Sequence, residues 1–128
     1  KEDRQGHSEP VELWGSGSPL REFLHVDDLG QAVLFALEHK LEEHLYNVGS
    51  GSDLTIKSLA EMIQKVVGHS GDIVWDETKP DGTPKKLMDS SKLNLLGWRA
   101  TIDLEKGIKM TYEWFLENIK SFKELEIN

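Results

Sequence analysis

The sequence contains no cysteine. Disulfide bonds, thiolate zinc sites and cysteine nucleophiles are therefore excluded. The absence agrees with a reducing compartment, so we expect a cytoplasmic protein. None of the five histidines forms an i, i+4 helical pair, and no third ligand lies near any two of them. We therefore expect no metal site.

Basic residues and long apolar runs are also scarce. Lys and Arg total 15 against 23 Asp and Glu, which gives a formal net charge of -8 at pH 7. Nucleic acids and acidic lipid surfaces attract basic proteins, so we expect neither partner. No apolar run is long enough to span a bilayer, and no signal-peptide core is present. A phosphorylated small molecule stays a candidate ligand, because the local field of a site differs from the net charge.

Apolar residues recur at helical spacing in three segments, each bounded by residues that commonly cap helices. The three main helices predicted in this way cover 29–39, 56–67 and 104–119. The predicted caps are Asp27 or Asp28, Thr55, Gly68 and Asp103. A shorter helix is predicted to begin at Ser90 or Ser91 and to end at Gly97.

Short strands are predicted between these helices. They cover 11–14, 21–26, 45–48, 72–76 and an edge strand at 85–88. Helices and strands mix without strict alternation or repeat, which indicates an α/β or α+β fold with few short strands. Such small sheets are near the limit of independent stability, so the elements look cut from a larger fold. We expect a solvated N-terminal end at 1–10, one domain at 11–122 and a frayed tail at 123–128.

Two Gly-Ser-Gly turns resemble halves of a dinucleotide-binding loop. They are Gly15-Ser16-Gly17 and Gly49-Ser50-Gly51. The fingerprint needs a third glycine for close packing of helix on strand, but Leu20 and Leu54 occupy those positions. We therefore interpret both as ordinary turns and expect no Rossmann cofactor site in this chain.

Other catalytic patterns are weak. The sequence has no Gly-x-Ser-x-Gly nucleophile elbow. Asp27 and Asp28 are adjacent acids, but capping of the following helix is favoured over acid–base chemistry. His25 lies in a predicted apolar strand, where a structural role is favoured.

A ligand site is first suggested by the stretch from Trp14 to Arg21. It places a flat aromatic ring and a guanidinium on either side of a Gly/Ser/Pro turn. A base or sugar can pack on the ring, and arginine forms paired hydrogen bonds to phosphate oxygens. The alternative is a core tryptophan and a surface ion pair between Arg21 and Glu22.

The second stretch runs from Lys79 to Lys86 and contains two prolines, which stiffen the loop. Asp81 offers a carboxylate that can accept hydrogen bonds from ribose hydroxyls or a base N–H. Three lysines provide a local positive field in an acidic chain. The alternative is a solvated turn whose lysines favour solubility.

Together these stretches resemble signature blocks of the GDP-L-fucose synthases, enzymes of the extended short-chain dehydrogenase class. The matching segments are 14–28, 47–51 with Thr55-Ile56, 79–89, 96–98 and 112–118, in the same order and spacing. The resemblance extends from about Val11 to Asn118. Its most diagnostic part is Pro80-Asp81-Gly82-Thr83-Pro84, since related dehydratases and epimerases usually differ there.

The resemblance implies an NADP-dependent 3,5-epimerase/4-reductase acting on GDP-4-keto-6-deoxymannose, of which this chain is the C-terminal, substrate-binding part. It implies substrate-binding roles for four residues. Arg21 and Lys86 would hold the diphosphate, Trp14 would pack near the nucleotide-sugar, and Asp81 would contact the GDP moiety. The expected partners are a GDP-sugar and an N-terminal cofactor domain that this chain lacks.

The family's catalytic groups have no counterpart in this chain. Its catalytic base is the tyrosine of a Tyr-x-x-x-Lys pair, whereas Ser50 follows Tyr46 by four residues and Leu116 follows Tyr112. The cysteine used in epimerisation is also missing. We therefore expect no catalysis and no NADP binding by this chain alone, and we expect its exposed apolar faces to favour self-association.

Three other readings stay open at this point. The chain could be a stand-alone nucleotide-sugar-binding module, which a native start codon near Lys1 would indicate. It could be a structural or dimerisation piece without a ligand. It could also belong to another NAD-dependent sugar-nucleotide epimerase or dehydratase, which competition between guanosine and uridine nucleotides would reveal.

Overall fold

The structure is a computed structural model that describes residues 9–125, with the side chains of residues 9–119. Most of the expected N-terminal end therefore lies outside the described residues, as do residues 126–128. The elements in chain order are β1 (Val11–Trp14), β2 (Leu20–Glu22), α1 (Val26–Glu38), β3 (Asp53–Thr55), α2 (Ile56–Val67), β4 (Ile73–Asp76), β5 (Lys85–Lys86), α3 (Ser91–Leu95) and α4 (Leu104–Leu125). Helix α4 thus continues into the segment expected to be a frayed tail.

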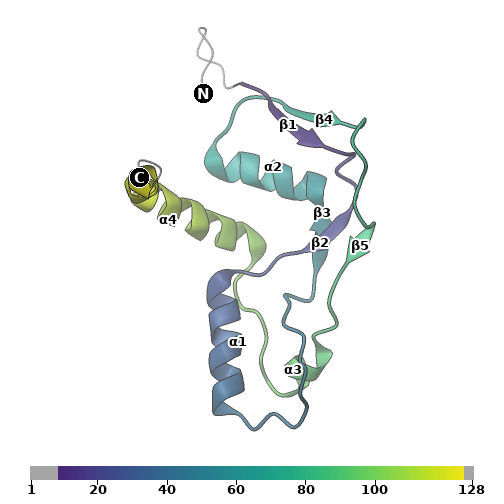
Figure 1. Cartoon of the computed structure of the whole chain (residues 1–128), viewed down its shortest axis with the longest axis vertical. Helices are drawn as coiled ribbons and strands as arrows, with labels where there is room; N and C mark the ends of the chain where they lie inside the picture. Colours follow the sequence, from purple (N-terminus) through teal and green to yellow (C-terminus); the bar gives the residue numbers. More distant parts are fainter. Residues whose placement is uncertain (1–8, 126–128) are drawn as a thin grey trace.

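The strands form two small sheets (Figure 1). Strand β1 pairs in parallel with β4, so that Val11 lies opposite Ile73 and Trp14 opposite Asp76. Strand β2 lies between β3, which is antiparallel to it, and β5, which is parallel. Because β1 and β4 are parallel, the loops that follow them both start at the carboxyl end of their sheet.

The three main helices form in the predicted segments, and three of the predicted caps are confirmed. The Thr55 hydroxyl accepts a hydrogen bond from the Ser58 N–H at the start of α2, and Gly68 ends that helix in a left-handed conformation. Asp103 accepts a hydrogen bond from the Lys106 N–H at the start of α4. Helix α2 packs against α4. Within the described residues, no helix combines the length and apolarity that crossing a bilayer requires.

The start of α1 corrects two sequence predictions. The strand predicted at 21–26 ends at Glu22, and the helix begins at Val26, earlier than expected. Its N-cap is His25, whose Nδ1 accepts a hydrogen bond from the Asp27 N–H at 3.2 Å. Capping by Asp27 or Asp28 is therefore wrong, although His25 does have a structural role.

Asp28 is instead one of the most buried polar residues, with 2% of its surface exposed. Its carboxylate accepts hydrogen bonds from the Thr101 N–H at 3.1 Å, the Thr101 hydroxyl at 3.0 Å and the Ile102 N–H at 2.9 Å. Burial would raise the pKa of this carboxyl, but these hydrogen bonds outweigh it and hold the pKa below the ordinary 3.8. Asp28 thus ties α1 to the segment that leads into α4.

The segment 45–48 is not a strand, contrary to the prediction. A strand needs a neighbour to satisfy its backbone groups, and no strand of the described chain pairs with this segment. Tyr46 and Val48 nevertheless pack against the core, and the Asn47 side chain donates a hydrogen bond to the Asp89 carbonyl. Strand β3, at Asp53–Thr55, was not predicted, because three residues carry no alternating pattern.

The buried core of the described residues is small. It contains Ala32 of α1, Leu93 of α3 and Trp98. Partly buried residues packed around it are Leu24, Phe35, Tyr46, Val48 and Ala100. This core joins α1 to α3 at one end of the molecule, whereas β1, β4 and α2 lie at the other (Figure 1).

Candidate functional site

Two loops meet at the carboxyl end of the β1–β4 sheet. The first follows Trp14, and the second follows Asp76 and contains Asp81. One Asp81 oxygen accepts a hydrogen bond from the Ser16 N–H at 2.9 Å, and the other lies 2.6 Å from the Ser16 hydroxyl. The two stretches that the sequence singles out are therefore in direct contact. In open α/β sheets, ligands bind in the crevice outside the carboxyl ends of the strands.

The Asp81 carboxylate is held ionised by these contacts. Hydrogen bonds from the Ser16 hydroxyl and the Ser16 N–H lower its pKa below the ordinary 3.8. A carboxylate has about four lone-pair positions, so two hydrogen bonds leave acceptor capacity. Asp81 thus connects the loops and keeps the ability to accept a ligand hydroxyl or N–H.

The glycines of the first loop are required by this close approach. Gly15 and Gly17 both have positive φ angles. A Cβ on Gly15 would lie 2.4 Å from an Asp81 oxygen, and one on Gly17 would lie 2.6 Å from the Trp75 ring. Both positions therefore need glycine for backbone conformation and for space.

Arg21 and Lys86 are neighbours on paired strands. They lie opposite each other in the parallel register of β2 and β5. Residues opposite each other in such a pair project from the same face of the sheet, so their positive charges share one side. The Arg21 guanidinium donates a hydrogen bond to the Leu20 carbonyl at 2.7 Å. Its Nη2 atom also lies 3.1 Å from the position that a Cβ on Gly82 would occupy, which places it against the second loop.

Trp14 lies at the end of β1 with 72% of its surface exposed. The alternative of a core tryptophan is therefore wrong for this residue. The ammonium group of Lys79, from the second loop, lies 5.5 Å from the centroid of its ring. The four predicted site residues thus lie on or beside the two joined loops and the β2–β5 pair.

Sequence reasoning missed the role of Glu22. Instead of pairing with Arg21, its carboxylate accepts hydrogen bonds from the Gly51 N–H at 2.8 Å and the Met88 N–H at 3.1 Å. A Cβ on Gly49 would lie 2.5 Å from a Glu22 oxygen. Glu22 therefore holds the second Gly-Ser-Gly turn and the segment after β5 against β2. Its position next to Arg21 in the sequence gave no signal of this.

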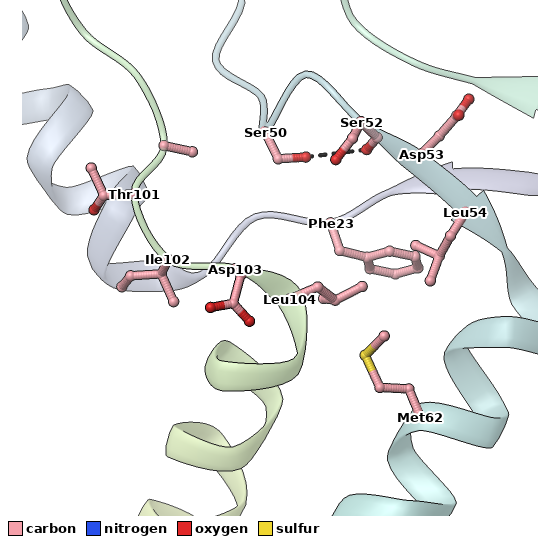
Figure 2. A pocket seen from close by; sticks show the side chains of 11 residues that line it. Phe23, Ser50, Ser52, Asp53, Leu54, Met62, Thr101, Ile102, Asp103 and Leu104 are labelled. Atoms are coloured by element: carbon pink, nitrogen blue, oxygen red, sulfur yellow. Dashed lines mark hydrogen bonds between the residues drawn. The ribbon is translucent and has the colours of Figure 1, made fainter.

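A separate cavity of about 450 Å³ opens between β3, α2 and the segment before α4. Figure 2 shows Phe23, Leu54, Met62 and Leu104 around its apolar part, with Ser50 and Asp103 at its polar side. The Ser50 hydroxyl donates to the Ser52 carbonyl, and Asp103 accepts from the Lys106 N–H. None of the four predicted site residues lines this cavity.

The glycine turns do not fit a dinucleotide phosphate. A phosphate-binding loop needs open backbone N–H groups at the start of a helix. Here Gly15 and Gly17 pack against Asp81 and Trp75, and Gly49 packs against Glu22. The Gly51 N–H is already bonded to Glu22.

Among residues 9–119, no group of three or more acidic or histidine side chains is placed to hold a metal ion.

The chain resembles known proteins in sequence and in fold. The NAD dependent epimerase/dehydratase family matches residues 3–49. The probable GDP-L-fucose synthase 1 of Oryza sativa subsp. japonica is 52% identical over 123 residues, which cover 96% of this chain and 38% of that protein. The chain is thus similar in sequence to GDP-L-fucose synthases. The putative GDP-L-fucose synthase 2 of Arabidopsis thaliana is 54% identical over 123 residues, which again cover 96% of this chain and 38% of that protein.

A solved GDP-L-fucose synthetase from Naegleria fowleri, bound to NADP, has a similar fold. Its TM-score is 0.81 at 30% identity, covering 87% of this chain and 36% of that one. The resemblance inferred from the sequence and the extended dehydrogenase fold class are thereby confirmed. The chain spans 38% of the length of the two plant synthases.

Proposed function

We propose that this chain forms the GDP-sugar-binding part of an NADP-dependent epimerase/reductase that converts GDP-4-keto-6-deoxymannose into GDP-L-fucose. The observation that carries the proposal is the Asp81–Ser16 contact. It joins the loop after Trp14 to the loop after Asp76 at the carboxyl end of a parallel sheet. The similarity to GDP-L-fucose synthases supports the choice of ligand. NADP would be held by the remainder of such an enzyme.

Each predicted site residue then has a role that its surroundings allow. Arg21 and Lys86, on one face of β2 and β5, supply the positive charge that a diphosphate needs. Trp14 offers an exposed ring for a flat or apolar part of the ligand. Asp81 accepts hydrogen bonds from the nucleoside while it keeps the loops joined.

Calorimetric titration of the chain with GDP-L-fucose tests this proposal. We expect saturable binding that Arg21→Ala weakens about 10- to 100-fold, because hydrogen bonds to charged groups contribute about 1.5 to 3 kcal/mol. Arg99→Ala, which removes an exposed arginine outside the site, should leave the affinity unchanged. UDP-glucose should bind at least tenfold more weakly.

Equal affinity for both sugar nucleotides would instead favour a related epimerase or dehydratase. Absence of binding would contradict a binding function for this chain on its own. Saturable binding that Arg21→Ala leaves unchanged would remove the diphosphate role from that residue.

The exposed stripe of α1, defined as Val26, Leu29, Val33 and Leu37, supports a second proposal. All four are exposed apolar residues at helical spacing, and such a face favours burial against a partner. We propose that two copies of the chain associate through this stripe.

Sedimentation velocity should show association that increases with concentration and that Val33→Lys weakens about tenfold or more. Gln31→Lys, on another face of α1, is the matched control, and a monomeric wild-type chain would contradict the proposal.

A further inference from the structure

A positive charge from the second loop lies over the Trp14 ring. It belongs to the ammonium group of Lys79. Its Nζ lies 5.5 Å from the ring centroid, within the range of a cation–π interaction. The ring is otherwise largely open, with 72% of the residue exposed. A cation over one face of an indole leaves the opposite face free to stack on a flat ligand.

The position of Lys79 is fixed by the strand beside Trp14. The Lys79 N–H donates a hydrogen bond to the Asp76 carbonyl at 3.2 Å, and its Nζ lies 3.9 Å from an Asp76 carboxylate oxygen. Asp76 is the residue directly opposite Trp14 in the β1–β4 register. The same strand end therefore supports both the lysine and the tryptophan that it covers.

We propose that Lys79 is a positioning residue of the GDP-sugar site, which covers one face of the Trp14 indole and so presents the other face to the ligand. The inference rests on the proposed function, and it adds a residue that acts through Trp14 rather than on the diphosphate. Lysine carries out this role by charge and reach, so arginine can replace it and an apolar side chain of similar length cannot.

The test compares GDP-L-fucose affinities of the wild-type chain with those of Lys79→Met, Lys79→Arg and a control, Lys109→Met, on the exposed face of α4. We expect Lys79→Met to bind about three- to fivefold more weakly and Lys79→Arg to stay within about twofold of wild type. The control should be unchanged. In a Trp14→Phe background, where the cation–π interaction is weaker, the effect of Lys79→Met should fall below about twofold.

A readout without ligand separates positioning from direct contact. The amide–nitrogen correlation spectrum contains an indole signal for Trp14, which Trp14→Phe identifies. Lys79→Met should shift that signal, and Lys109→Met should not.

The outcomes distinguish this inference from the function on which it rests. Three outcomes would overturn the positioning role alone. The first is a Trp14 signal that Lys79→Met does not shift, and the second is an unchanged affinity in Lys79→Met. The third is an equal loss of affinity from Lys79→Met in the wild-type and Trp14→Phe backgrounds. Absence of binding by the wild-type chain would overturn the proposed function and this inference with it.

Discussion

Replacing Leu93 with alanine is expected to lower the free energy of unfolding by about 3 kcal/mol. Leu93 is the largest fully buried side chain among the described residues, and it packs with Ala32 and Trp98. Because the core is small, few neighbours can move to fill the space that alanine would leave. Urea denaturation followed by tryptophan fluorescence would measure the change, since Trp98 lies in this cluster.

The matched control lies two residues further along the same helix. Leu95 has 87% of its surface exposed, so Leu95→Ala removes the same atoms without opening a cavity. We expect this control to change the unfolding free energy by no more than about 0.5 kcal/mol. Equal losses in the two variants would show that α3 does not pack on α1 in solution.

Replacing Asp28 with alanine is expected to lower the free energy of unfolding by about 2 to 3 kcal/mol at neutral pH. The change would remove an ionised acceptor and leave the N–H groups of Thr101 and Ile102 without their partner. A buried donor that loses its acceptor costs about 1 to 3 kcal/mol. Chemical denaturation at pH 7 would measure the loss, with the exposed Asp27→Ala as the neighbouring control.

The effect of Asp28 should also depend on pH. Its folded pKa is held below 3.8, whereas the unfolded chain has the ordinary value. The carboxylate therefore contributes stability above that ordinary value, and the contribution disappears as the pH falls through the folded pKa. The difference between wild type and Asp28→Ala should shrink in strongly acidic solution. A constant difference from pH 7 to strong acid would argue against the ionised Asp28 as its source.

The helices of this fold could be predicted because they depend on local information. Apolar spacing locates α1, α2 and α4, and the caps at Thr55, Gly68 and Asp103 need only neighbouring residues. The failure at α1 has a physical reason. Asp28 can cap a helix, but its three distant donors in Thr101 and Ile102 hold it in a buried position instead.

The sheets were less predictable because strand pairing is a long-range property. Residues 45–48 have the apolar character of a strand, but they find no partner among the described residues. The sequence of strand β3 has little alternation of apolar and polar residues. It is a strand because its backbone pairs with β2. Three residues are too few for alternation to identify.

For the candidate site, the sequence suggests a ligand chemistry but not the contacts between the loops. The residue types of Trp14 and Arg21 point to a nucleotide ligand without knowledge of the fold. The contact of Asp81 with Ser16 and the two distant hydrogen bonds of Glu22 depend on loops that meet only in three dimensions. Their roles could not be read from a single sequence.

The parallel pairing of β1 with β4 sets an order of events during protein synthesis. Val11 cannot find its partner until Ile73 has been made, and Arg21 must wait for Lys86. Helices α1 and α2 have no such constraint, because their hydrogen bonds join residues close in sequence. On the ribosome, therefore, the first strands emerge long before their parallel partners. The loops that contain Ser16 and Asp81 can be joined only after Asp81 has been made.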